Sequence, residues 1–379
     1  TPMDCVKEMV DKIPDEFWNR KNIKILDSCC GNGNFHAYIT TKTNLKNLYF
    51  NEINQKRVEN LKRYFGNNIN ISMKDFLSFE SKEEYDLVVS NPPFAKFDNN
   101  NSRVSKNHNL SRDFLKKALE ITKRNGYVLF ILPNNWMSYS DRNILPKLLT
   151  RYQFLYLNIN GAKKWFPKVG SSFTWFLLHK VPNKNEVVID NSYILKDRQE
   201  SIIDPNINYI PLYYSEIVRN IFNKTINNET LPKYQIETNS FLHRFTKKEN
   251  IRNEKSNVFC YKLIHTPKQT VWSNIPHKYQ DGYKVFLSLS DQYKTFIDNC
   301  GMTQSIAYIR CNSKEEAEKM EKDLNVDFYK FVNNLTRYGN FNNIRILQHF
   351  PIFGSFKLTK KEEDFIKKFN EGYYGKGKK

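Results

Sequence analysis

Between Lys21 and Pro133, short apolar runs alternate with stretches that have helical spacing. The apolar runs are IKILDSCCGNG, NLYFNEIN, INISMKDF, YDLVVSNPPF and GYVLFILP, and the helical stretches include QKRVENLKRYF and DFLKKALEITKRN. Strands that alternate with helices are typical of a mostly parallel sheet with helices on both faces. The alternation therefore predicts a doubly wound, Rossmann-like α/β domain.

This domain has further predicted elements on either side of that region. The opening residues TPMDCVKEMVDKIP have helical spacing, with Thr1 as the N-cap and Pro2 as the first helical residue. FLYLNING and SSFTWFLLHKV indicate two more strands around the loop AKKWFPKVG. A chain of 379 residues favours two domains. We expect the first to cover residues 1–185 and the second residues 186–379.

The second half has weaker strand signals and many Asn-rich turns, which predicts a mixed α+β domain. Ser313, with Glu316 three residues later, indicates the start of one helix. A second helix is indicated by apolar residues at helical spacing, namely Phe328, Phe331, Val332 and Leu335. The basic C-terminal tail GYYGKGKK is expected to be disordered.

The charge of the chain indicates a polyanionic partner. There are 59 Lys and Arg residues against 40 Asp and Glu, which gives a formal net charge of +19. Such an excess is typical of proteins that bind nucleic acid. A Lys-, Asn- and Ile-rich composition can also reflect an AT-rich genome, so both explanations stay open.

Other residue patterns argue against a secreted, zinc-binding or membrane-spanning chain. The six cysteines form no C-x-x-C pair, and no His spacing suggests a metal site. No apolar run reaches membrane-spanning length, and no secretory h-region opens the chain. We therefore expect a reduced, cytoplasmic protein without a metal. The chain begins at Thr1 without a Met, which leaves open where its natural N-terminus lies.

Polar residues stand at the carboxyl ends of the first four predicted strands: Asp27, Glu52, Asp75 and Asn91. In an open α/β sheet, ligands bind in the crevice outside these ends. Gly31 and Gly33 follow the first strand and would let a ligand approach the backbone closely. A dinucleotide site would need Gly or Ala where His36 stands, which argues against a pyrophosphate cradle.

The acids suggest an adenosine-bearing cofactor instead. Glu52 lies about 20 residues after the glycines, the distance at which a carboxylate binds ribose hydroxyls. Asp75 could accept a hydrogen bond from the adenine amino group. Taken singly, each acid would be an ordinary solvated loop residue. Together they favour S-adenosylmethionine as the cofactor.

The segment Asn91-Pro92-Pro93-Phe94 fits methyl transfer to a planar amino group. The lone pair of such an amine is delocalised, and two acceptors aimed at its N–H bonds would free it for in-line attack. The side-chain oxygen of Asn91 and the carbonyl of Pro92 can be these acceptors, and the prolines fix φ. Phe94 would stack on the substrate. The alternative reading is a rigid surface turn after a strand.

These motifs resemble the adenine-N6 DNA methyltransferases in which the cofactor motifs precede the target recognition domain. The resemblance rests on TP at 1, DSCCGNGNF at 27, NEIN at 51, KDF at 74 and NPPF at 91. It departs from the family at Ser28, where proline is common. It implies cofactor contacts from ten residues, namely Thr1, Pro2, Asp27, Ser28, Gly31, Gly33, Phe35, Glu52, Asp75 and Asn91.

The resemblance also implies contacts to the substrate. Phe166 would be a second aromatic residue against a flipped-out base, and the alternative is that Phe166 is ordinary core. The second half is similar to the C-terminal region of restriction-modification adenine methylases, which would make it the DNA recognition domain. Candidate DNA contacts come from HTPKQTVWSN, with Lys268, Gln269 and Trp272, and from LTRYGNFNN, with Arg337, Asn340, Asn342 and Asn343.

The expected activity is therefore methylation of a flipped-out adenine in double-stranded DNA, and a cognate restriction endonuclease is a further candidate partner. Several alternatives stay open. The first is methylation of adenine in RNA, and the others are cytosine-N4 methylation, methylation of protein glutamine, and a catalytically silent nucleic-acid binder. Asn in the first motif position favours adenine over cytosine by family resemblance.

Overall fold

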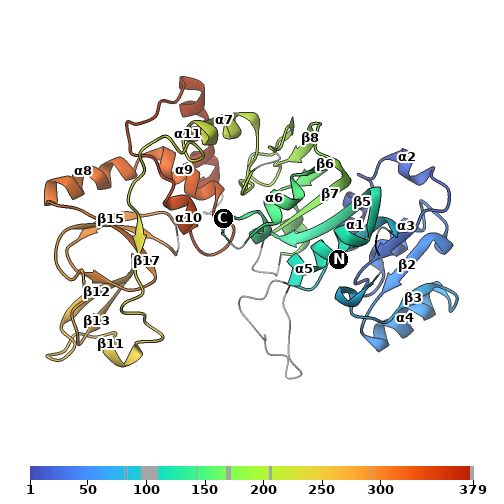
Figure 1. Cartoon of the computed structure of the whole chain (residues 1–379), viewed down its shortest axis with the longest axis horizontal. Coiled ribbons are helices and arrows are strands. Elements are labelled where there is room, and N and C mark those ends of the chain that lie inside the picture. The colour runs from blue at the N-terminus through green and yellow to red at the C-terminus, as the bar shows by residue number, and fades with distance from the viewer. Residues whose placement is uncertain are drawn as a thin grey trace. The chain divides into compact units, whose positions relative to one another are not determined.

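The computed structural model describes residues 1–80, 82, 84–94, 110–141, 143–167, 172–204, 207–290 and 292–375. The chain divides into two compact units (Figure 1). The first comprises Thr1–Met137 and Asp141–Ile210, and the second comprises Ser138–Ser140 and Pro211–Lys379. The expected boundary at residue 185 is therefore too early, because two additional strands join the first sheet after that point.

The described part of the first unit is built around a nine-stranded sheet with the order β3-β2-β1-β4-β5-β7-β6-β8-β9. The strands are β1 (Ile25–Asp27), β2 (Leu48–Asn51), β3 (Asn70–Ser72), β4 (Tyr85–Ser90), β5 (Thr122–Pro133), β6 (Tyr152–Asn158), β7 (Phe173–Pro182), β8 (Val187–Asp190) and β9 (Arg198–Ser201). Strands β3, β2, β1, β4 and β5 run parallel to one another. β7 lies antiparallel between β5 and β6.

Helices and short helical turns connect these strands. They are α1 (Met3–Val10), α2 (Asp15–Trp18), α3 (Asn34–Ile39), η1 (Leu45–Asn47), α4 (Gln55–Phe65), η2 (Phe76–Ser78), α5 (Leu110–Ile121), η3 (Asn134–Met137), α6 (Leu145–Leu149) and η4 (Gly161–Trp165). Pro2, expected as the first helical residue, is instead the N-cap of α1. The boundary moves by one residue because Pro2 has a non-helical ψ of 146°.

The sheet is buried on both faces. Along β4, Leu87 and Val89 belong to a core cluster that also holds residues of α1, α2 and α3. Val88 points to the opposite face, since successive strand residues alternate, and it is 0% exposed as well. Strands buried on both sides read as continuous apolar runs rather than as alternating ones. This confirms the predicted doubly wound α/β domain.

The second unit contains two four-stranded sheets in its described residues, with the orders β10-β17-β14-β15 and β11-β13-β12-β16. The strands are β10 (Glu237–Thr238), β11 (Ile251–Arg252), β12 (Tyr261–Thr266), β13 (Gln269–Ser273), β14 (Lys284–Ser288), β15 (Thr295–Asp298), β16 (Gly301–Met302) and β17 (Ile306–Arg310). The helices are α7 (Glu216–Lys224), η5 (Lys248–Asn250), α8 (Lys314–Leu324), α9 (Asp327–Leu335), α10 (Ile344–Leu347) and α11 (Lys360–Gly375).

Both helices predicted in this half are present. Ser313 caps α8 by accepting a hydrogen bond from the amide of Glu316 at 3.1 Å, and the Glu316 carboxylate accepts one from the amide of Asn312 at 2.7 Å. The four apolar residues predicted for the second helix lie on α9 and are at most 5% exposed. The prediction of a disordered tail is wrong for residues 372–375, which belong to α11. Its last four residues, 376–379, lie outside the described part.

Candidate functional site

The loop after β1 brings two glycines into left-handed conformations. Gly31 has φ +56° and Gly33 has φ +80°, values that favour glycine strongly. A Cβ on Gly33 would also come within 2.7 Å of Leu61 Cδ2 and 2.8 Å of Phe65 Cε2, so α4 packs directly on this position. The loop therefore needs glycine both for its turn and for the close approach of α4.

Asp27, the last residue of β1, is a buried carboxyl with an unsatisfied oxygen. The residue is 1% exposed, and Oδ1 accepts a hydrogen bond from the amide of Cys29 at 3.4 Å. Oδ2 has no hydrogen-bond donor within the described part of the chain. Burial raises the pKa of Asp27 to about 7, because water no longer solvates the charged form. Such an oxygen suits a cationic or donor group of a ligand.

Glu52 is held at the end of β2 by backbone amides. Its Oε2 accepts a hydrogen bond from the amide of Gly31 at 2.8 Å, and its Oε1 accepts one from the amide of Asn54 at 2.9 Å. Arg57 approaches Oε2 at 3.8 Å. Each carboxylate oxygen has a second lone pair, so Glu52 can still accept hydrogen bonds from hydroxyl groups.

Asp75 is the exposed N-cap of η2, three residues beyond the end of β3. Its Oδ1 accepts a hydrogen bond from the amide of Leu77 at 3.0 Å. Because β3, β2, β1 and β4 are parallel neighbours, Asp75, Glu52, Asp27 and Asn91 follow strand ends at one edge of the sheet. The structure thus gathers the four predicted residues along this edge.

Asn91 directly follows β4, and its side chain is oriented by Thr1. The Asn91 Nδ2 donates a hydrogen bond to Thr1 Oγ1 at 3.0 Å, across 90 residues of sequence. Thr1 is itself held by Asn34, whose Nδ2 donates to the Thr1 carbonyl at 2.6 Å. The Oδ1 of Asn91 accepts no hydrogen bond from the described residues. The amide oxygen is therefore the part of this side chain that is left for a ligand.

The loop after β1 and the end of β4 are joined by hydroxyl groups. Ser28 donates a hydrogen bond from Oγ to Ser90 Oγ at 2.8 Å, and its amide donates to the carbonyl of Val89 at 3.2 Å. Cys29 Sγ lies 2.9 Å from Ser90 Oγ. Ser28, where the resembled family commonly has proline, is 0% exposed. Its hydroxyl thus fixes the loop after β1 relative to the residue that precedes Asn91.

Phe94 and Phe166 lie beside the same aromatic ring. Phe173, at the start of β7, is 5.4 Å from Phe94 and 5.2 Å from Phe166 between ring centroids. Phe94 and Phe166 are partly buried and pack against the core cluster of the first unit. Pro92 is buried and Pro93 is exposed. The structure therefore brings the two predicted aromatic residues together, with partly exposed faces.

The predicted residues Pro2 and Phe35, and His36 beside them, have mainly structural contacts. Pro2 caps α1, and Phe35, in the first turn of α3, is 3% exposed in the core cluster. His36 is 0% exposed, with Nε2 2.8 Å from the carbonyl of Tyr49, and burial lowers its pKa to about 4. His36 therefore fills the space between α3 and β2, where a dinucleotide-binding loop would have a small residue.

The DNA-contact candidates fall on two segments of the second unit. Lys268 is exposed in the β12–β13 turn, and Trp272 lies on β13 with Lys255 Nζ 5.2 Å from its ring centroid. Arg337 and Asn340 share the loop between α9 and α10, where an Arg337 guanidinium nitrogen donates to the Asn340 carbonyl at 3.1 Å.

Three other polar side chains of these segments have structural partners. Gln269 accepts a hydrogen bond from Arg244 at 2.9 Å. Asn342 is 5% exposed and donates to the carbonyl of Ser288, and Asn343 caps α10. Asn342 and Asn343 are therefore not free to read bases as the sequence suggested, because the fold uses their amides to anchor the loop.

Sequence reasoning missed two residues that organise the site, Ser90 and Phe173. Ser90 contacts the loop after β1, and Phe173 packs beside both predicted stacking rings. Ser90 stands next to the NPPF motif, which is the signal that could have drawn attention to it. Phe173 is one of many aromatic residues in strand-like sequence, so no local pattern distinguishes it.

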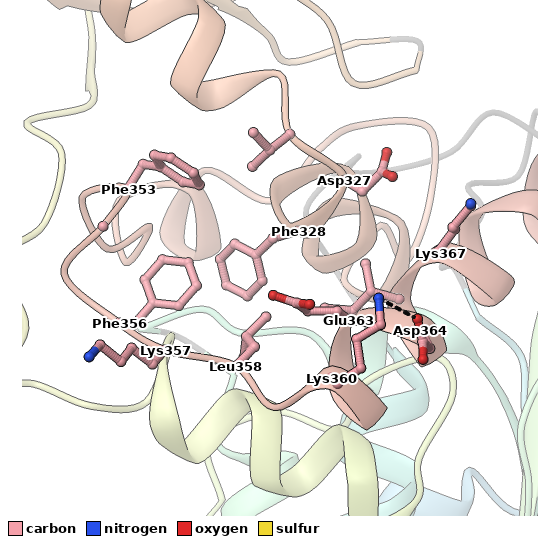
Figure 2. Close-up of a pocket in the computed structure, with 13 residues that line it drawn as sticks. Asp327, Phe328, Phe353, Phe356, Lys357, Leu358, Lys360, Glu363, Asp364 and Lys367 are labelled. Atoms are coloured by element: carbon pink, nitrogen blue, oxygen red, sulfur yellow. Dashed lines mark ion pairs between the residues drawn. The ribbon is translucent and has the colours of Figure 1, made fainter.

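A separate hollow of about 550 Å³ lies within the second unit. Figure 2 shows Phe328, Phe353 and Phe356 grouped on one side of it and the ion pair of Lys360 with Asp364 on the other. Its charged lining residues are Asp327, Lys357, Lys360, Glu363, Asp364 and Lys367. Carboxylates and lysines balance here, so this hollow has no excess positive charge to attract a phosphate.

Within the described residues, no three His, Cys, Asp or Glu side chains gather closely enough to hold a metal ion. No helix in that same part of the chain is both long and apolar enough to cross a membrane.

Comparison with known proteins identifies similar sequences. Residues 16–166 match the family model of the Eco57I restriction-modification methylase. The chain is 28% identical over 144 residues to the Type II methyltransferase M.AccI of Acinetobacter calcoaceticus, over 34% of this chain and 26% of that protein. It is 26% identical over 174 residues to the Type II methyltransferase M.VspI of Vibrio sp. (strain 343), over 41% of this chain and 42% of that protein. The matches thus span less than half of each relative.

A solved structure resembles the whole chain in fold. The cryo-EM structure of a DrdV–DNA complex matches with a TM-score of 0.59 and 11% identity, over 98% of this chain and 56% of that one. At this identity the likeness concerns the fold alone. Together with the family match, it confirms the predicted methyltransferase fold and the resemblance to restriction-modification methyltransferases, whose cofactor is S-adenosylmethionine.

Proposed function

We propose, because residues 16–166 resemble restriction-modification methylases, that this chain transfers a methyl group to the N6 amino group of adenine in double-stranded DNA. One observation supports the proposal that the methyl acceptor is an amino group. Asn91 follows β4 at the sheet edge that holds Asp27 and Glu52, and its amide nitrogen is bound by Thr1. The Asn91 side-chain oxygen is thereby left to accept a hydrogen bond from an N–H group of the substrate.

The residues at the sheet edge fit the cofactor. The unpartnered Oδ2 of Asp27 would pair with the ammonium group of the methionine part, and Glu52 would accept hydrogen bonds from the ribose. Asp75, which is exposed, would accept one from the adenine amino group. Gly31 and Gly33 allow close approach, and Thr1, Pro2, Ser28 and Phe35 complete the proposed set. S-adenosylmethionine supplies an electrophilic methyl group on a sulfonium when bound.

The catalytic task of the chain is to prepare the amine. Asn91 Oδ1 and the carbonyl oxygen of Pro92 would accept hydrogen bonds from the two N–H groups of the substrate amine. These hydrogen bonds would draw the amine nitrogen towards a tetrahedral geometry and free its lone pair. Both prolines restrict the backbone of the motif, so the acceptors need little reorganisation. Phe94 and Phe166, which both contact Phe173, would hold the base by stacking, worth roughly 1 to 3 kcal/mol per base.

The second unit would supply DNA recognition, and the domain division of the chain supports this role. Lys268, Trp272, Arg337 and Asn340 are the proposed contacts, without assignment to particular bases. The adenine would be flipped out of the duplex, at a cost of a few kcal/mol that stacking on Phe94 offsets. A restriction endonuclease activity, on the same or another chain, is the proposed biological partner.

The test is to incubate the purified chain with S-adenosylmethionine and unmethylated duplex DNA, then identify methylated nucleosides by mass spectrometry. We expect N6-methyladenine from the unchanged chain. Asn91→Ala should lose at least about a hundredfold in rate, since it removes an acceptor needed in the transition state. Calorimetry should still show cofactor binding to this variant, weakened by the loss of one of the ten proposed contacts.

Asn68→Ala is the matched control, because Asn68 is exposed between α4 and β3 and makes no side-chain hydrogen bond to the described residues. Its activity should be unchanged. If the product is N4-methylcytosine, the methylated base is cytosine and the assignment to adenine is wrong. Methylation of structured RNA but not of DNA would overturn the assignment to DNA.

A further inference from the structure

Phe341 is a large apolar side chain that projects from the loop between α9 and α10. It is 69% exposed. No aromatic ring or cation of the described residues packs on it. Single exposed apolar residues are common on protein surfaces, so exposure alone carries no argument. The backbone around Phe341, however, is held in place on both sides.

The C-terminal side of Phe341 is anchored by Asn342. Its amide donates to the carbonyl of Leu289 at 2.9 Å, and its Nδ2 donates to the carbonyl of Ser288 at 2.7 Å. Its Oδ1 accepts a hydrogen bond from Asn333 Nδ2 at 3.1 Å. Asn342 is 5% exposed, so these are buried hydrogen bonds that would be costly to break.

Further contacts extend this anchor. Asn343 Oδ1 accepts hydrogen bonds from the amides of Arg345 and Ile346 in α10. Its Nδ2 donates to the carbonyl of Tyr139 at 3.0 Å. Phe341 itself forms an isolated antiparallel bridge with Ser290. On the N-terminal side, Arg337 binds the carbonyl of Asn340 at 3.1 Å. These contacts anchor the backbone on both sides of Phe341, so the loop cannot move as a whole without losing several of them.

The charge of the segment suits a polyanion. From Thr336 to Ile352 there is no Asp or Glu, and Arg337 and Arg345 lie on either side of Phe341 in the sequence. An exposed ring on an anchored loop without acidic residues can approach DNA without repulsion, and little backbone entropy is lost when the ring becomes buried.

We propose that Phe341 inserts into the base stack of bound DNA and stabilises the distorted duplex from which the target nucleotide is flipped. This inference rests on the proposed DNA methyltransferase function. Apolar side chains that enter a base step unstack it, and a rigid flat ring replaces part of the lost stacking. Phe341 is thus a positioning residue for the DNA and does not contact the reacting atoms.

The experiment first locates the adenines that the unchanged chain methylates, by sequencing DNA that it has modified. Two duplexes are then made around one such site. In the first, the target adenine is paired normally. In the second, the target adenine faces an abasic position. It has no pairing partner there, so it can leave the stack without an inserted Phe341 ring. The ratio kcat/KM is measured on both duplexes for the unchanged chain and each variant.

We expect Phe341→Ala to lower kcat/KM on the paired duplex by about tenfold or more, the loss that removal of one stacking contact produces. On the abasic duplex its rate should lie within about threefold of that of the unchanged chain, since flipping is already favoured there. Phe341→Trp keeps a flat ring and should retain activity on both. Tyr64→Ala removes an aromatic residue that is 76% exposed on α4, and should change neither rate.

Equal losses for Phe341→Ala on the two duplexes would overturn the inference, because a general binding or folding defect does not depend on pairing of the target. Unchanged activity of Phe341→Ala on the paired duplex would also overturn it. Absence of DNA methylation by the unchanged chain would instead reject the proposed function, and the inference with it.

Discussion

At the scale of single residues, Asp27 has the most distinctive chemical environment at the sheet edge. It is 1% exposed, one of its oxygens has no donor in the described part of the chain, and burial raises its pKa to about 7. Without a bound cation, the folded chain therefore holds a proton on Asp27 between pH 3.8 and about 7 that the unfolded chain releases. The contribution of Asp27 to stability thus falls as the pH rises through this window.

This linkage predicts how cofactor affinity depends on pH. The ammonium group of the cofactor should pair with the ionised carboxylate, so binding below about pH 7 must expel the proton. We expect the affinity to weaken by up to about tenfold for each pH unit below that value. Calorimetry in two buffers of different ionisation enthalpy would measure both the affinity and the released proton.

Asp27→Asn is the control for that measurement, because it keeps the size of the side chain and removes the titrating group. It should bind the cofactor more weakly at pH 8 and show a flatter pH profile. A profile as steep as that of the unchanged chain would assign the pH dependence to another group.

At the scale of elements, the contact between the glycine loop and α4 sets the geometry of the sheet edge. Gly33 begins α3 in a left-handed conformation, and its missing side chain leaves room for Leu61 and Phe65. The same loop donates the Gly31 amide to Glu52. Packing of α4 on the loop and positioning of the Glu52 carboxylate therefore depend on the same few residues.

A pair of glycine substitutions separates backbone strain from overpacking in this loop. Gly33→Ala should destabilise the chain by about 2 to 4 kcal/mol, because it adds a steric clash to the cost of a left-handed Ala. Gly31→Ala also has positive φ, but its nearest atom is Arg57 Nη1 at 4.0 Å. It should cost only about 1 to 2 kcal/mol. Urea unfolding measures both, and equal losses would contradict the packing argument.

At the scale of the whole molecule, the excess of positive charge is the property that bears most directly on DNA binding. The formal net charge is +19. Each phosphate that a Lys or Arg neutralises releases condensed counterions, which makes affinity depend steeply on salt. The charge alone gives no sequence preference, since phosphates are the same at every position.

We therefore predict that DNA affinity falls by at least about tenfold between roughly 50 and 200 mM salt. Lys268→Ala should reduce the slope of log affinity against log salt by about 1, if Lys268 contacts a phosphate. Lys314→Ala is the matched control, because Lys314 forms an ion pair with Glu318 on α8 at 3.3 Å. Fluorescence anisotropy at several salt concentrations gives these slopes, and a flat dependence would argue against nucleic acid as the partner.

Local patterns were sufficient to predict strands β1 to β7, helices α1, α4 and α5, and the residues at the strand ends. The NPPF motif and the glycines could be read directly, because strand periodicity and turn chemistry depend on neighbouring residues. The residues of β8 and β9 were placed in the second domain, and neither strand was predicted. The sequence around them shows only short strands, and the sheet that they join is not visible locally.

The amino-acid sequence by itself determined the alternation of strands and helices, the order of the cofactor motifs and the chemistry that they can perform. Only the tertiary structure decided which partners orient these groups. The hydrogen bonds of Asn91 with Thr1 and of Ser28 with Ser90 join residues 90 and 62 positions apart. The burial of Asn342 and the shared contact of Phe94 and Phe166 with Phe173 likewise depend on chain segments meeting in space. A local pattern cannot encode such contacts, because they arise from the packing of the whole sheet and its helices.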